Sequence, residues 1–165
     1  MADFRLRVTY AETGRLVMLS HLEIARALER AVRRAGLPYA VSQGFSPHMK
    51  QAFGSALPVG VGGLEEIFDV SLTDYVPPEE ALARLRASSA PDLMPHAARY
   101  ITKDETAASA AYPRSTYEAL LEASHSGDCE MDVLAAAHEL SLPSEITVVR
   151  KKKERVLVPS EFVVG

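Results

Sequence analysis

Four arginines recur at helical spacing between residues 26 and 34 and form the clearest group of chemically useful side chains. They are Arg26, Arg30, Arg33 and Arg34. On a helical wheel they share an arc of about 100°. Arginine guanidinium groups bind phosphate or carboxylate in a bidentate manner, so the group favours an anionic partner. The alternative is a solvated helix face, which is the usual position of charges opposite an apolar stripe.

A second group lies between residues 43 and 50, among glycine and proline residues. Its members with usable side chains are Gln43, Phe45, His48 and Lys50. Phe45 suits either stacking on a nucleobase or anchoring in the core, and His48 suits proton transfer or phosphate binding. Irregular loops on a rigid sheet commonly carry function. The alternative is a structural loop whose polar groups satisfy its own backbone.

His21 is a weaker candidate, and together with His48 it is the only suggestion of catalysis. It follows Ser20, the predicted N-cap of the helix, where the helix dipole favours a neutral imidazole. It would act as a base or pack on Leu16. We expect the chain to return from the helix end so that loop 43–50 lies beside His21. An anion there would also meet the free N–H groups of the helix.

A third basic group, at residues 150–153, is predicted to form the tip of a hairpin. It consists of Arg150, Lys151, Lys152 and Lys153, which would contact phosphate or serve solubility alone. Aromatic residues are sparse and tryptophan is absent, which disfavours a broad base-stacking platform. The only cysteine is Cys129, so neither a disulfide nor a cysteine-held cluster is expected within the chain. No metal or cofactor is predicted, because the histidines lack ligand spacing.

The charge distribution agrees with a local basic surface. The 165 residues carry a net charge of −4, but residues 1–54 hold eight Lys and Arg against four Asp and Glu. Residues 55–149 are strongly acidic and residues 150–165 are basic again. Affinity for nucleic acid depends on local charge, so RNA is not excluded as a partner. No run of 18 apolar residues and no secretory leader is found, which predicts a cytoplasmic protein without membrane contact.

The elements that must position these groups follow from periodicity. Alternation predicts strands over residues 4–10, near 50–57, over 66–72 and over 93–101. Ser20 with Glu23 predicts a capping box opening a helix over residues 20–35, and Pro77-Pro78 opens a second helix. We expect an α+β protein whose residues 4–103 form a βαββαβ, ferredoxin-like unit.

Residues 104–111 are small and polar and are predicted to be a linker. Beyond it, residues 112–165 predict a partial second βαββ unit. Its expected elements are a strand over 114–121, a helix over 128–140 and a hairpin of 146–149 with 156–158. The apolar residues 162–165 end abruptly, which predicts that the chain is truncated there.

Three stretches, taken in order, carry a resemblance to a known family. They read GRL followed by SHLE (residues 14–23), RRAGLP (residues 33–38) and SQGFSPH (residues 42–48). The chain resembles the radical-SAM-linked protein family of unknown function. The resemblance implies an accessory domain that is fused to, or encoded beside, a radical SAM protein. With one cysteine, the chain lacks the three-cysteine motif of the radical enzyme itself.

The resulting expectation is an accessory domain that binds structured RNA and has no catalytic activity of its own. Two other functions remain open at this point. One is a protein-interaction module that docks a radical SAM partner without nucleic acid. The other is a ribonuclease with His21 or His48 as its base.

Overall fold

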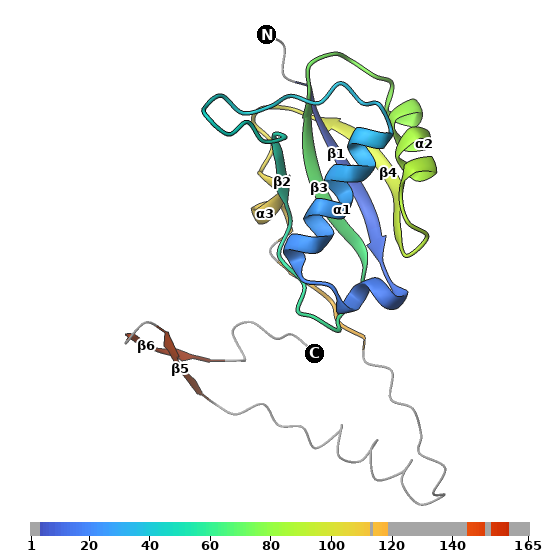
Figure 1. The fold of residues 1–165 in the computed structure, drawn as a ribbon. Coiled ribbons are helices and arrows are strands. Elements are labelled where there is room, and N and C mark those ends of the chain that lie inside the picture. Colours follow the sequence, from blue (N-terminus) through green and yellow to red (C-terminus); the bar gives the residue numbers. More distant parts are fainter. Residues whose placement is uncertain (1–3, 113, 119–144, 151–152, 159–165) are drawn as a thin grey trace, which may run out of the picture. The chain divides into compact units, whose positions relative to one another are not determined.

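The structure is a computed structural model, in which residues 4–112, 114–118, 145–150 and 153–158 are described (Figure 1). The chain divides into two compact units, Met1–Thr116 and Tyr117–Gly165. In the first unit the elements are β1 (Phe4–Glu12), η1 (Gly14–Met18), α1 (His21–Arg34), β2 (Gln51–Phe53), β3 (Gly63–Leu72), α2 (Pro78–Ser88), β4 (Leu93–Ile101) and α3 (Ala108–Ala111). In the second, β5 (Ile146–Arg150) pairs with β6 (Lys153–Leu157).

The first unit is built on an antiparallel four-stranded sheet in the order β2-β3-β1-β4. In the central pair of strands, β1 and β3, Phe4 lies opposite Leu72 and Val8 lies opposite Phe68. On its other side β1 pairs with β4, where Arg5 lies opposite Ile101. The chain is therefore an α+β protein, as the alternation and the amphipathic helix predicted.

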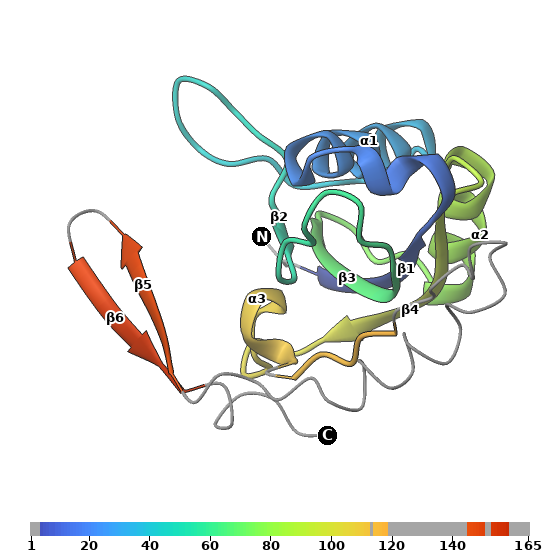
Figure 2. The ribbon, with the colours of Figure 1, turned by 90° about the horizontal axis from the view of Figure 1, so that it is seen from below.

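One face of the sheet is covered by α1 and α2, which Figure 2 shows on the side opposite α3. Alternate residues of the strands supply the core beneath them, with Leu6, Val8, Phe68 and Val70 fully buried. From α1 the core receives Ile24, Leu28, Ala31 and Val32, and from α2 it receives Ala81 and Leu85. These residues form the apolar stripe of each helix.

Helix α1 begins where the sequence predicted, with Ser20 as its N-cap. The Glu23 carboxylate accepts hydrogen bonds from the Ser20 N–H (2.8 Å) and hydroxyl (2.6 Å). Gly36, at φ 62°, takes the left-handed conformation that ends the helix. Both ends of the helix are therefore set by local sequence.

The opposite face of the sheet carries charged residues that are buried. The Arg7 guanidinium donates to the two carboxylate oxygens of Asp69 from Nε (2.7 Å) and Nη2 (2.9 Å). Nη2 also donates to the Thr106 carbonyl (2.8 Å). The segment predicted as a linker, 104–111, thus contains a helix and contacts the sheet, and Ala108 of α3 is buried.

The second unit is described only in part. The predicted hairpin is confirmed by β5 and β6, which are antiparallel with Ile146 opposite Leu157. Residues 114–118 form no strand, so that part of the predicted strand 114–121 is wrong. The predicted helix 128–140 lies outside the described residues.

Candidate nucleic-acid interface

The four arginines of α1 lie on its solvent face, as the helical wheel predicted. Arg26, Arg30, Arg33 and Arg34 are all exposed, whereas Ile24, Leu28 and Val32 are buried on the other side. Arg33 and Arg34 belong to the last turn, where positive charge also complements the helix dipole. The arginine face therefore exists, with its density of charge greatest toward the end of the helix.

Arg33 connects this face to the loop that follows. It donates to the Glu29 carboxylate from Nη2 (2.6 Å) and to the Tyr39 hydroxyl from Nη1 (2.6 Å). Its guanidinium carbon also lies 4.9 Å from the centre of the Tyr39 ring. The hydrogen bond to Glu29 raises the pKa of Arg33 above its ordinary value. Among the described residues, no hydrogen bond or ion pair engages Arg30 or Arg34.

The loop between α1 and β2 has a closed stem and an exposed tip. In the stem, Val41 forms a β-bridge with Met49, and the Ser42 N–H donates to the His48 carbonyl (2.8 Å). The His48 N–H returns a hydrogen bond to the Ser42 hydroxyl (3.0 Å). Residues 43–47 at the tip are all exposed, and Gly44 takes a φ of 139°. The loop is therefore held at its base, while its tip faces solvent.

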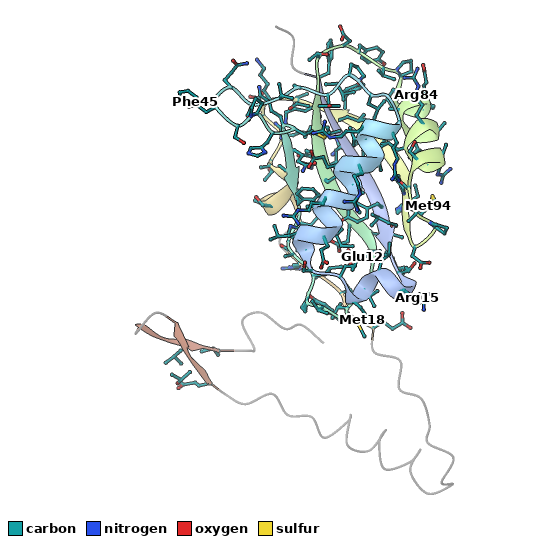
Figure 3. All side chains as sticks on the ribbon, in the orientation of Figure 1. Glu12, Arg15, Met18, Phe45, Arg84 and Met94 are labelled. Atoms are coloured by element: carbon teal, nitrogen blue, oxygen red, sulfur yellow. The ribbon has the colours of Figure 1, made fainter. Side chains whose placement is uncertain are left out.

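Phe45 is the most unusual residue of this loop. It is fully exposed, although phenylalanine is normally among the more buried residue types. Figure 3 shows it extending from the body of the first unit. Of the two uses predicted for it, anchoring the loop in the core is thereby wrong. His48 and Lys50 in the same loop are exposed as well, and the Ser46 hydroxyl lies 3.4 Å from His48 Nε2.

The structure does not bring His21 and His48 together. His21 is half-buried and packs edge-on against Phe53, with ring centres 5.4 Å apart. His48 precedes Phe53 by five residues in an extended segment, a separation of about 16 Å along the strand. Figure 3 correspondingly shows Phe45 at one end of the unit and Met18 and Arg15 at the other.

The expectation failed because residues 39–42 do not run back along the helix. Tyr39 forms a bridge with Leu72 at the end of β3, Val41 then pairs with the chain's own return at Met49, and β2 follows along β3 from Gln51. The predicted anion notch at the start of α1 is therefore not formed by this loop. In the described part of the chain, no hydrogen bond joins His21 or His48 to a carboxylate.

The lysine-rich hairpin tip belongs to the second unit. Arg150 lies opposite Lys153 at the ends of β5 and β6, and Lys151 and Lys152 lie outside the described residues. Their role in binding stays a prediction. Within the described ranges, no group of His, Cys, Asp and Glu side chains is arranged to hold a metal ion. Nor does any helix there have the length and apolar character needed to span a membrane.

The sequence reasoning missed the charged cluster on the opposite face of the sheet. Arg5 and Arg7 alternate with Leu6 and Val8, and such alternation normally places the polar residues in water. Here the Arg7 and Asp69 side chains are each only 5% exposed. One signal in the sequence could have indicated this pair. Asp69 lies in another predicted strand with the same alternation, so it offered Arg7 a partner of opposite charge.

Comparison with models of protein families assigns the chain to one family. The model of the family described as an uncharacterized protein conserved in bacteria (DUF2344) matches residues 5–159. The chain belongs to this family. The match spans both units and includes the arginine face and the exposed loop. Searches of curated proteins and of solved structures found no match.

Proposed function

We propose that this DUF2344 chain is an accessory domain of a radical SAM protein and that it binds unpaired nucleotides of a structured RNA. The motifs at residues 14–23, 33–38 and 42–48 support the radical SAM association. The order of elements and the sheet order β2-β3-β1-β4 support a ferredoxin-like arrangement for the first unit. RNA binding rests on one observation. A fully exposed Phe45 lies in a loop that begins at Tyr39, and Tyr39 accepts a hydrogen bond from Arg33 at the arginine-bearing end of α1.

The chemistry of that end fits single-stranded RNA. Every base has an aromatic face, so a base stacking on Phe45 gains roughly 1–3 kcal/mol without sequence selectivity. Phosphates on either side require nearby cations, and Arg30 and Arg34 are exposed on the adjacent helix face. Arg33 is already engaged by Glu29 and Tyr39, so it positions the loop. A single exposed ring suits the splayed bases of RNA loops and bulges better than a duplex.

The test is fluorescence anisotropy with a labelled RNA hairpin at several salt concentrations. Phe45→Ala should weaken binding by roughly 5- to 150-fold, which corresponds to about 1–3 kcal/mol. The double variant Arg30→Gln with Arg34→Gln should weaken binding. It should also make the fall of log affinity with log salt concentration less steep. Arg84→Gln is the matched control, because Arg84 is an exposed arginine on α2 that pairs with Glu80. Absence of binding at low salt, or an equal loss with the control, would contradict the proposal.

A second candidate function, docking of a protein partner, is favoured by an apolar patch at the other end of the unit. Met18, Leu22 and Val59 are exposed there. The Gly60 N–H donates to the Val17 carbonyl (2.7 Å), which holds the loop carrying Val59 beside η1. Co-purification with the cognate radical SAM protein should be lost on Met18→Glu with Leu22→Glu while RNA binding persists. Unchanged co-purification would contradict docking through this patch.

A further inference from the structure

Three polar side chains, those of Tyr10, Glu12 and Glu66, meet where β1 ends beside the start of β3. Tyr10 lies opposite Glu66 in the strand register, and Glu12 lies opposite Gly63. The Glu66 side chain folds back over Gly63, since a Cβ added there would lie 2.8 Å from Glu66 Oε1. Burial, and then the charges of Glu66 and Glu12, raise the pKa of Tyr10, which reflects the proximity of the three groups. Together they form an acidic site.

The polar groups of the acidic site lack partners. Tyr10 and Glu12 are only 3% and 5% exposed. Among the described residues, no hydrogen bond or ion pair engages the Tyr10 hydroxyl or the carboxylates of Glu12 and Glu66. The fully enclosed polar atoms without a partner in this part of the chain belong instead to Gln51 and Ser89, so the oxygens of Tyr10 and Glu12 retain some contact with solvent. A buried carboxyl without a hydrogen bond costs stability, which points to a ligand that supplies donors from outside.

The acidic site adjoins the exposed apolar patch at the same end of the unit. Gly62 connects the two, because a Cβ added there would lie 2.9 Å from the Glu12 carbonyl oxygen and 3.3 Å from Val17 Cγ1. Val17 directly precedes Met18, and its carbonyl holds the loop that carries Val59. Figure 3 likewise shows Glu12 and Met18 at one end of the first unit. A partner seated on the apolar patch therefore passes close to the unpaired carboxyls.

We propose that the acidic site binds the ammonium group of a lysine side chain of the docking partner. The inference rests on the second candidate function, docking through the apolar patch. An ammonium group has three N–H donors and no acceptor, which matches the three oxygen-bearing groups of Tyr10, Glu12 and Glu66. Its positive charge compensates the buried carboxylate, and the four-carbon stem of lysine packs on apolar side chains such as Met18.

Two other cations fit the site less well. A Ca²⁺ ion takes six to eight oxygen ligands, more than two carboxyls and one hydroxyl provide. Within the described ranges, no group of three or more His, Cys, Asp and Glu side chains could hold a metal. The chain's own Arg15 lies at the same end of the unit (Figure 3), but in the described part of the chain it makes no ion pair with Glu12 or Glu66. The cation is therefore expected from a partner.

The experiment measures the affinity of the full chain for the purified cognate radical SAM protein by biolayer interferometry. Glu12→Gln keeps the shape of the side chain but removes its charge, and it should weaken binding by about tenfold or more. The matched control is Glu79→Gln, because Glu79 is an exposed glutamate of α2, and it should leave the affinity unchanged. Circular dichroism checks that each variant is folded. Weaker binding by a variant that is no less stable is an effect that a purely structural role of Glu12 would not produce.

The outcomes separate the two proposals. If Glu12→Gln binds like the wild-type chain while Met18→Glu with Leu22→Glu does not bind, the lysine inference is overturned and docking stands. An equal loss with Glu79→Gln also overturns the inference. If the radical SAM protein does not bind at all, the Tm is measured with a peptide that carries one lysine between leucines.

The matched peptide carries acetyl-lysine, which has lost the positive charge. A rise in Tm with the lysine peptide that acetylation or Glu12→Gln removes supports the lysine site and overturns only the choice of partner. No rise overturns both proposals.

Discussion

Replacing Arg7 by leucine should strongly destabilise the first unit. The Arg7 and Asp69 side chains are each 5% exposed and joined by hydrogen bonds of 2.7 and 2.9 Å. Without Arg7, the Asp69 carboxylate keeps only the long contact with Arg5 (3.4 Å), and the Thr106 carbonyl loses its donor. Removing one partner of a buried ion pair costs about 3–5 kcal/mol, because the other charge stays buried. Since whole domains are stable by only about 5–15 kcal/mol, the loss should be large.

The free energy of unfolding is measured by urea denaturation followed by circular dichroism. The double variant Arg7→Leu with Asp69→Leu should recover most of the loss, because apolar replacement of a buried ion pair is often neutral or stabilising. Arg84→Leu, which breaks an exposed pair, should cost at most about 1 kcal/mol. A cost below about 1 kcal/mol for Arg7→Leu would refute the reasoning, since it would mean that water reaches Asp69.

Three further predictions concern single elements. Ser20→Ala removes the N-cap hydroxyl that donates to Glu23 and should cost about 1 kcal/mol in urea denaturation; an unchanged midpoint would count against the capping box. Burial raises the pKa of Glu12, and the charge of Glu66 adds to this effect. The protonated carboxyl therefore contributes its full stabilisation below the pKa of the unfolded chain. This contribution is lost as pH rises through the higher pKa of the folded chain. Glu12→Gln should therefore stabilise the chain near pH 7 and flatten the dependence of Tm on pH above about 4.5. A lower Tm at neutral pH would show that the charged form is the stabilising one. Gly14→Ala should lower the Tm more than Gly36→Ala: both glycines have positive φ, but a Cβ at Gly14 would lie 2.6 Å from the Asp92 carboxylate, whereas one at Gly36 meets nothing within 4 Å. Equal losses would show that backbone strain alone decides.

The elements of the first unit were largely predictable because their signals are local. The stripe of Ile24, Leu28 and Val32, with a capping box before it and Gly36 after it, defines α1 without reference to the rest of the chain. Alternation likewise located β1, β3 and β4. The strand expected near 50–57 is shorter and spans Gln51–Phe53. Its last link to β3 is the hydrogen bond from the Gly54 N–H to the Ile67 carbonyl.

What escaped prediction depends on contacts between distant segments. The burial of Arg7 requires Thr106 and α3 to cover the sheet, and alternation in β1 carries no information about what lies above it. The direction of loop 39–50 is decided by the bridge between Val41 and Met49, which no periodic pattern announces. The arginine face was found because it needs only the helix, whereas the buried pair of Arg7 and Asp69 requires the register of β1 with β3.

The residues that made the family recognisable mostly build the scaffold. Gly14 is confined by φ 55° and by the Asp92 carboxylate, Glu23 caps α1, and Gly36 ends it. The exposed tip, residues 43–47, is under little such constraint. The first motif therefore marks the scaffold, whereas the third, residues 42–48, contains the exposed tip itself. Differences in ligand within the family should be sought as changes among residues 43–47.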